Sequence, residues 1–469
     1  MTKKKKLLLI LAGVMIAVMA AAYTAMALYF RHHFYSNTTI NGINCTEMDV
    51  QAAKQALSDE VRNYTLSLVK MDGTEEILTA EQMGLTFMDD GEVDQLLAEQ
   101  NSWLWLREFF SDKRHELKVS VEIDANAVRS ALEGLSCMQE GNFISPEDAV
   151  IVETETGFEI TPEVEGNQLD LEKTVEAVCQ AAVNGEERVD LEAAGCYLKP
   201  SIYRDNTELL EKLNRKNQLV IADLTMDFGS GRTETVNAAL LKTWLVQDEA
   251  GNDAIDENQI RTYVSTLAEK YNTYHTTRYF EKTGGGTAVL TLGDYGWLID
   301  EETTVSELSA AIAEGRQGTF EVTYENTAKS RALNDIGSSY VEISIDQQTM
   351  WCYVDGQPIV STPVVTGCVA NGTETPRGGV WKVKTRKTDY TMTGKTDPET
   401  GKPSYTAHCN YWVPYSEDLT IGLHDLVTRT AFGGDIYLTN GSHGCVNTPL
   451  EAMEQIFEVV AYGFPVVVY

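Results

Sequence analysis

The first 33 residues differ sharply in hydropathy from the rest of the chain. Four lysines, Lys3 to Lys6, precede an almost uninterrupted apolar run of 24 residues, Leu7 to Phe30. About 20 apolar residues suffice for a helix to cross a bilayer, so this run predicts a transmembrane helix. The lysines before it predict that the N-terminus stays in the cytoplasm and that everything after Arg31 lies outside.

A cleaved signal peptide is the alternative for this segment. Residues 25–27, Ala-Met-Ala, form a small-residue pattern of the kind that signal peptidases cleave. The apolar run is longer than a usual signal core, however, and we therefore favour an uncleaved anchor.

Beyond this run, one order of elements occurs twice. Each copy has a strand, a capped helix, a glycine and a second strand, and each follows another helical segment, which predicts two related α+β modules. The first copy comprises residues 125–135, 157–163, 169–178, Gly185 and 188–191, and the second comprises 257–270, 296–300, 305–312, Gly318 and 320–323. Neither copy contains a convergent His/Cys cluster or a phosphate-binding loop.

The pattern changes near residue 340. Residues 326–339 are polar and predict a linker, and alternating apolar residues then predict strands at 340–345, 350–354 and 359–365. More short strands follow, then one helix from Leu450 to Val460 and a closing strand at 466–469. The chain is therefore expected to be an α+β multidomain protein that ends in a β-rich domain.

Charge and cysteine content narrow the possible partners. With 37 basic and 70 acidic residues the formal net charge is −33, which argues against nucleic acid because phosphate binding needs a basic surface. An acidic, soluble surface suits an extracytoplasmic setting. The eight cysteines show no CxxC spacing, and most are interpreted as buried thiols. The sequence neither establishes nor excludes a disulfide between Cys179 and Cys196.

The most reactive combination of residues lies near the C-terminus. Residues 442–447 read Ser-His-Gly-Cys-Val-Asn, and His424-Asp425 lies upstream, so two imidazoles are available to a thiol. Residues 448–451, Thr-Pro-Leu-Glu, are typical of a capping box with proline at the first helical position. We therefore expect Cys445 to face the positive end of a helix dipole, which lowers a thiol pKa from about 8.5. The alternative is a small buried hydrophobic residue.

These motifs resemble the catalytic domain of L,D-transpeptidases of the YkuD type. The resemblance rests on residues 421–425 (Ile-Gly-Leu-His-Asp), on residues 442–447, and on residues 375–381 (Thr-Pro-Arg-Gly-Gly-Val-Trp), which are similar to the Thr-Pro-x-Gly segment of the family. It covers roughly residues 338–469. The start of the exported part, residues 39–53, is similar to wall-associated repeat domains that precede such enzymes in Gram-positive bacteria.

The resemblance assigns roles to the motif residues. It implies that Cys445 is the nucleophile, that His424 is the general base and that Asp425 orients it, unless Asp425 is only a solvated turn residue. His443 is expected to shape the site or contact the oxyanion, or else to make structural hydrogen bonds. The backbone N–H groups of Gly444 and Cys445 are candidate oxyanion donors.

The remaining site assignments are less direct. Ser442 and Asn447 are expected to hold the catalytic loop, and Tyr411 and Trp412 to line the substrate cleft, although these aromatic residues could equally belong to the core. No metal or cofactor is expected: His408-Cys409 lacks zinc-site spacing, and a metal-bound thiolate could not act as a free nucleophile.

The resemblance also implies a reaction and a cellular location. Cys445 would form a thioester with a peptidoglycan stem peptide and release D-alanine, and an amine of a second stem would then complete a 3→3 cross-link. The partners are donor and acceptor stems, the membrane through one N-terminal helix, and carbapenem-type β-lactams as inhibitors. The enzyme would be a single-pass protein of a Gram-positive type of cell, with its catalytic domain facing the wall. An L,D-carboxypeptidase and a non-catalytic wall-binding scaffold are the alternatives.

The domain boundaries follow from these patterns. The expected segments are 1–33 (cytoplasmic tip and transmembrane helix), 34–120 (N-terminal part of the wall-associated region), 121–200 and 201–325 (the two modules), 326–337 (linker) and 338–469 (catalytic domain).

Overall fold

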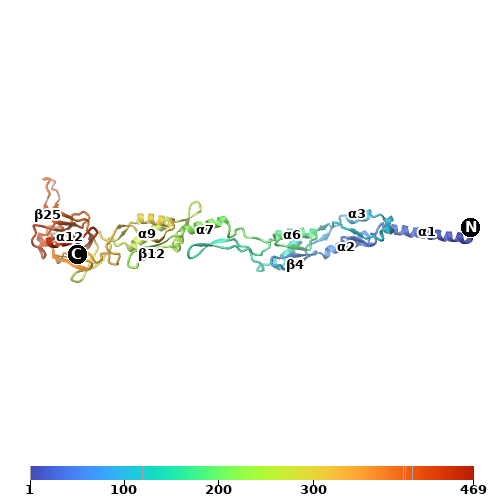
Figure 1. Ribbon diagram of the computed structural model, residues 1–469, viewed down its shortest axis with the longest axis horizontal. Helices are drawn as coiled ribbons and strands as arrows, with labels where there is room; N and C mark the ends of the chain where they lie inside the picture. The colour runs from blue at the N-terminus through green and yellow to red at the C-terminus, as the bar shows by residue number, and fades with distance from the viewer. Residues whose placement is uncertain (1, 119, 395, 397, 404) are drawn as a thin grey trace. The chain divides into compact units, whose positions relative to one another are not determined.

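The computed structural model describes residues 2–118, 120–394, 396, 398–403 and 405–469. The chain forms two compact units. Unit 1 comprises Met1–Ile151 and Ile160–Leu210, and unit 2 comprises Val152–Glu159 and Glu211–Tyr469. Figure 1 follows the chain from α1 at the N-terminus to α12 within the C-terminal domain. Helices and strands are mixed in both units, and the predicted α+β multidomain class is confirmed.

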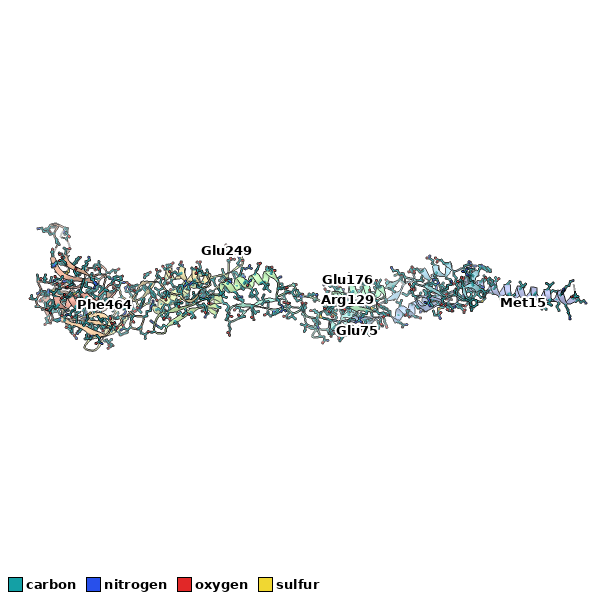
Figure 2. The ribbon with its side chains drawn as sticks, in the orientation of Figure 1. Met15, Glu75, Arg129, Glu176, Glu249 and Phe464 are labelled. Carbon is teal, nitrogen blue, oxygen red and sulfur yellow. The ribbon has the colours of Figure 1, made fainter. Side chains whose placement is uncertain are left out.

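The apolar run forms α1 (Lys3–Tyr29). Within the described part of the chain, α1 is the one helix that is long and apolar enough to cross a membrane. Met15 projects from it without neighbours from the rest of the chain (Figure 2). At the C-terminal end of α1, Ala27 and the following Phe30 are buried against the rest of unit 1.

A small subdomain follows α1. Its sheet has the order β2-β1-β6, with β6 parallel to β1, and α2 begins at a capping Asp49, whose carboxylate accepts the Ala52 N–H. Phe34, Ile40 and Leu57 lie in its core. The elements are β1 (Thr38–Ile40), β2 (Ile43–Asn44), α2 (Val50–Asn63), α3 (Glu92–Glu99), η1 (Ser102–Leu104), α4 (Trp105–Glu108) and β6 (Lys113–His115).

The two predicted modules share one topology. In each, an antiparallel hairpin is followed by two helices and by a third strand that returns parallel to the first strand of the hairpin. The first module has β3 (Thr65–Val69), β4 (Glu75–Thr79), α5 (Ala125–Glu133), α6 (Leu171–Asn184) and β10 (Arg188–Asp190). The second has β11 (Asp223–Asp227), β12 (Thr233–Val236), α9 (Glu257–Tyr271), α10 (Glu301–Ala313) and β18 (Gln317–Thr319).

The predicted capped helices are present in both copies. The side chain of Asp170 accepts the amides of the first turn of α6, and Asp300 does the same for α10. Two details differ from the prediction. The strand expected at 320–323 lies at 317–319, and the first module takes its opening hairpin from residues 65–79, well before residue 121.

Short accessory elements complete the modules. A two-stranded pair follows the opening hairpin in both copies; in the first copy residues 88–120 are inserted into it, and they include α3, η1, α4 and β6. These pairs are β5 (Thr86–Phe87) with β7 (Val121–Glu122), and β13 (Leu245–Gln247) with β14 (Asp253–Ile255). The remaining elements are η2 (Ser136–Met138), α7 (Thr207–Leu219), α8 (Ala238–Thr243), β17 (Leu298–Ile299) and β19 (Tyr324–Asn326).

A hairpin between the two helices of each module packs on the segment that follows. The first, β8 (Val150–Glu153) and β9 (Phe158–Thr161), exchanges two hydrogen bonds with Asn217 through the backbone of Phe158. The second, β15 (Arg278–Glu281) and β16 (Thr287–Leu290), packs against the C-terminal domain, where Phe280 and Leu290 share a core with Val380 and Val467.

The polar segment 326–339 is not a free hinge. Asp335 is buried and accepts two hydrogen bonds from the Arg278 guanidinium, at 2.9 and 2.7 Å, and Tyr295 donates to its backbone carbonyl. The predicted linker is therefore tied to the second module by a buried ion pair.

The C-terminal domain contains two sheets around one apolar core. The first has the order β22-β21-β20-β28-β23 and the second β24-β25-β26-β27, and α12 contributes Met453 and Ile456 to the core between them. The strands are β20 (Tyr340–Ser344), β21 (Thr349–Val354), β22 (Gln357–Pro363), β23 (Gly379–Lys382), β24 (Lys387–Thr393), β25 (Thr406–Pro414), β26 (Gly422–Asp425), β27 (Val446–Thr448) and β28 (Pro465–Val468), and the helices are α11 (Ile436–Asn440) and α12 (Leu450–Val459).

Candidate active site

Neighbouring parallel strands bring the two predicted catalytic segments together. His424 lies on β26, and Cys445 directly precedes β27, with His424 in register with Asn447. Within the described residues, the Cys445 thiol donates to the Thr420 carbonyl at 3.4 Å rather than to His424. The indole of Trp412 lies beside the imidazole, with the ring centroids 5.6 Å apart, and belongs to the same apolar cluster as Cys445.

The His424 ring is held in one tautomer. Its Nδ1 lies 2.7 Å from the backbone carbonyl of Asp425, and because a carbonyl can only accept, Nδ1 carries the proton. Nε2 of a neutral ring is then an acceptor, and the Asn447 side-chain amide donates to it at 3.0 Å. The nitrogen that could accept a thiol proton is therefore the one that Asn447 contacts.

The carboxylate of Asp425 does not contact His424. It accepts the backbone N–H and the side-chain amide of Asn410, at 3.1 and 2.7 Å, and the backbone N–H of Tyr411 at 2.8 Å. Asp425 therefore contacts the base through its backbone carbonyl, its buried carboxylate holds β25, and the alternative of a solvated turn residue is wrong.

Side-chain hydroxyls hold the loop that carries Cys445. Ser442 Oγ accepts the Gly444 N–H at 3.0 Å and donates to the Cys445 carbonyl at 2.5 Å. Thr375 Oγ1 accepts the Gly367 N–H and donates to the Gly444 carbonyl at 2.8 Å. Gly444 has a φ of 114°, a backbone conformation that residues other than glycine rarely adopt.

These contacts change the candidate oxyanion donors. The Gly444 N–H is engaged by Ser442, whereas the described residues provide no hydrogen-bond partner for the Cys445 N–H. The Cys445 amide therefore stays a candidate donor, and Gly444 is free to act only if Ser442 rotates away.

A strand separates Cys445 from the helix that was expected to follow it. Residues 446–448 form β27, α12 begins only at Leu450, and neither Thr448 nor Glu451 caps it through a side chain. The prediction of a helix-lowered thiol pKa is thus wrong. Burial raises the pKa of Cys445 to about 11, partly offset by a hydrogen bond with the Gly422 backbone.

Burial acts on the base as well. Removal from water lowers the pKa of His424, and the hydrogen bond to the Asp425 backbone offsets this only in part. Since burial disfavours the thiolate and the imidazolium alike, the resting pair is a neutral thiol and a neutral imidazole.

Side chains from β24 and β25 cover the sulfur. Cys445 is 7% exposed and lies in a cluster with Met392, Cys409 and Trp412, against which Tyr390 and Tyr405 also pack. A substrate can therefore reach the sulfur only if part of this cover moves.

The other predicted site residues lie in different surroundings. His443 is exposed, and its ring stacks on Tyr405 with centroids 4.5 Å apart. Tyr411 packs on Phe457 of α12, at a centroid distance of 4.9 Å, and so has the alternative place in the core that the sequence left open. Trp412 is nearly fully buried beside the Cys445 cluster and can line the site only where the covering side chains open.

Sequence reasoning missed the contacts of Thr375 and Asn447. Thr375 begins a motif recognised in the sequence, but its link to Gly444 spans 69 residues and follows only from the fold. No pattern in the sequence pairs Asn447 with His424, since that contact depends on the register of β26 and β27.

All eight cysteines are free, including Cys179 and Cys196. Among the described residues, no group of three or more His, Cys, Asp or Glu side chains is arranged to hold a metal ion.

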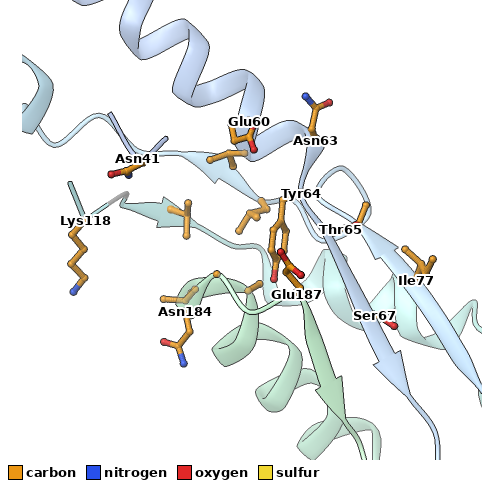
Figure 3. Close-up of a pocket in the computed structure, with 16 residues that line it drawn as sticks. Asn41, Glu60, Asn63, Tyr64, Thr65, Ser67, Ile77, Lys118, Asn184 and Glu187 are labelled. Carbon is orange, nitrogen blue, oxygen red and sulfur yellow. The ribbon is translucent and has the colours of Figure 1, made fainter. Parts of the chain in front are cut away.

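A separate hollow of about 830 Å³ lies in unit 1 (Figure 3). Tyr64 lies at its centre, with Asn184 and Glu187 from the end of α6 and the turn that follows, and Lys118 at its edge.

Family models match most of the chain. The model of the L,D-transpeptidase catalytic domain (YkuD) matches residues 338–468, and that of a peptidoglycan binding domain matches residues 78–190 and 229–321. No curated protein matches the chain.

Several solved structures are similar in sequence. An Enterococcus faecium L,D-transpeptidase, solved as a cysteine-to-serine mutant, is 31% identical over 55% of this chain and 100% of its own, with a TM-score of 0.46. The Ldtfm–avibactam carbamoyl enzyme is 31% identical over 56% of this chain and 98% of its own, with a TM-score of 0.46. The E. faecium catalytic domain acylated by ertapenem is 38% identical over 28% of this chain and 98% of its own, with a TM-score of 0.25.

Family membership rests on the sequence identity and on the two family models, because the TM-scores lie below 0.5. The identity of 31% extends over the whole length of a solved relative. The chain belongs to the L,D-transpeptidase family and joins a YkuD catalytic domain to peptidoglycan-binding domains.

Proposed function

We propose that this transpeptidase forms 3→3 cross-links through a thioester on Cys445. The observation that carries the proposal is the neutral His424 ring, whose unprotonated Nε2 is held by Asn447 in the strand next to Cys445. Such a ring can accept a proton during attack, as a general base does.

The proposed chemistry has two steps. The sulfur attacks the carbonyl of an L-to-D peptide junction while Nε2 of His424 takes the thiol proton, and the Cys445 N–H donates to the oxyanion. Collapse of the intermediate breaks the C–N bond, and the proton passes to the departing D-alanine. A side-chain amine of a second stem then attacks the thioester, forms the new amide and releases the thiol.

Acylation by a carbapenem tests the nucleophile. A relative is acylated by ertapenem, so we expect the same drug to add its mass to this chain and not to Cys445→Ala. Cys409→Ala is the matched control because Cys409 lies in the same apolar cluster, and it should still be acylated. Intact-mass measurement gives the answer, and an adduct on Cys445→Ala would refute the assignment.

Defined muropeptides test the second step. Tetrapeptide-containing substrates should give dimers with the wild-type chain and no dimers with Cys445→Ala. Shortened stems without dimers would mean that water, not an amine, resolves the thioester, as in an L,D-carboxypeptidase.

We also propose that α1 is retained as a membrane anchor with its N-terminus in the cytoplasm. The burial of Ala27 and the contacts of Tyr23 with Trp105 support this, because cleavage after Ala27 would remove both residues from the side chains that they pack against. The N-terminal peptide of the membrane-extracted protein should therefore be intact by mass spectrometry; a mature terminus at residue 28 would contradict the proposal.

A further inference from the structure

Residues 102–110, here called the aromatic segment, expose an unusual amount of apolar surface. The segment comprises η1, α4 and the two phenylalanines that follow, with the sequence Ser-Trp-Leu-Trp-Leu-Arg-Glu-Phe-Phe. Trp103 is 53% exposed and Phe110 83%, and Leu104, Leu106 and Phe109 are exposed as well. A contiguous apolar patch of this kind usually marks a surface that meets a partner or a membrane.

The tryptophans of the aromatic segment contact α1. Tyr23 of α1 donates its hydroxyl to the Trp103 carbonyl, and the Trp105 indole N–H donates to the Tyr23 carbonyl at 3.2 Å. The Trp105 ring also lies 5.5 Å from the ring of Tyr23 and 6.0 Å from that of Phe30. Trp103 and Trp105 are thereby placed along α1 near Tyr23, whereas the Phe109 carbonyl accepts a hydrogen bond from the side chain of Asn37 at 3.4 Å.

Tyr23 lies inside the apolar run rather than beyond it. At about 1.5 Å per residue, Tyr23 is about 10 Å below Phe30, the last residue of the run. If a hydrocarbon layer of about 30 Å instead begins at Leu7, it ends near Ala27, and Tyr23 still lies about 6 Å within it. In either case the aromatic segment reaches the depth at which interfacial helices bury their apolar face, about 5–10 Å.

We propose that the aromatic segment inserts into the outer leaflet beside α1 and is a second membrane contact of this protein. The inference rests on the proposed anchoring by α1 but not on the chemistry of Cys445. Tryptophans are enriched at membrane interfaces because they combine an apolar ring with an N–H donor. Arg31 and Arg107 are exposed cations, and Arg107 lies 3.7 Å from the Glu108 carboxylate. We expect both cations to meet lipid phosphates.

The consequence is a fixed membrane-proximal subdomain. A single helix alone would leave the exported part free to rotate at residues 31–33. Two membrane contacts, α1 and the aromatic segment, hold the first module at the membrane surface. The part of unit 1 that follows α1 would thus begin at a defined height above the lipid.

Tryptophan quenching by brominated lipids tests the proposal. The full chain is reconstituted in phosphatidylcholine–phosphatidylglycerol vesicles, with and without bromine on the acyl chains. Of the seven tryptophans, only Trp103 and Trp105 lie in the aromatic segment. We expect Trp103→Phe to lower the quenched share of the emission and Phe110→Trp to raise it.

Ile77→Trp is the matched control. Ile77 is 60% exposed on β4, in the same unit but outside the aromatic segment, so the added tryptophan should emit without being quenched. A chain that does not float with the vesicles would refute the anchoring by α1. A chain that floats but shows equal quenching in the wild type, Trp103→Phe and Phe110→Trp would refute insertion of the segment. A dimer whose interface covers the segment would refute insertion as well.

Discussion

The Cys445 thiol should stay protonated, and therefore slow to alkylate, throughout the neutral pH range. Burial raises its pKa from an ordinary 9.0 to about 11. At pH 7 this lowers the thiolate fraction about 100-fold, and because the thiolate is the nucleophile, alkylation slows by the same factor. Burial lowers the pKa of His424, so no imidazolium stabilises the thiolate. We expect the rate to rise about tenfold per pH unit between pH 7 and pH 10.

Iodoacetamide alkylation followed by peptide mass mapping measures this rate at Cys445 alone. Cys409 is an internal comparison, because burial raises its pKa to about 12 and it should react more slowly still. His424→Ala should leave the slope with pH unchanged, since a neutral imidazole adds no charge to the site.

A different dependence of the alkylation rate on pH would refute the assignment of a neutral thiol and a neutral imidazole. If alkylation reaches a plateau between pH 6 and pH 8, and if His424→Ala removes that plateau, the resting enzyme contains a thiolate and an imidazolium. The covering side chains slow alkylation at every pH, so they change its absolute rate but not its slope.

Three further substitutions test the contacts around the site. Asn447→Ala removes the hydrogen bond to Nε2 of His424. We expect ertapenem acylation to slow about 10- to 100-fold with little change in the melting temperature. A lower melting temperature without slower acylation would indicate a structural role only. Tyr405→Ala should speed iodoacetamide alkylation of Cys445 at every pH, and an unchanged rate would mean that other side chains control access. Thr375→Val leaves two buried backbone groups unpaired and should destabilise the catalytic domain by about 2–4 kcal/mol, measured by calorimetry; an unchanged melting transition would contradict this.

The parts of the fold that depend on local signals could be predicted from the sequence. The apolar run is α1, and the capped helices after Asp170 and Asp300 are present because each carboxylate accepts amides of the first helical turn. The opening hairpin of the first module was missed because its third strand lies more than 100 residues away, at 188–190. Such non-local pairing leaves no periodic pattern in the sequence.

The environment of Cys445 was mispredicted for the same reason. The segment Val446–Thr448 is too short to show alternation, so the helix signal after it dominated, although these residues pair with β26 as a buried strand. The side chains that cover the sulfur come from β24 and β25, which lie 30 to 60 residues upstream. A thiol pKa depends on both features, and neither is local.

The two functions found at position 425 follow from strand geometry. Successive side chains of a strand point to opposite faces, so the carboxylate of the residue after His424 cannot lie on the same face as the imidazole. Its backbone carbonyl can reach Nδ1, and any residue at this position would supply that carbonyl. The carboxylate is thus free to bind the amides of Asn410 and Tyr411 and so to place β25, which carries Trp412. One residue therefore fixes the tautomer of the base through its backbone and one wall of the site through its side chain.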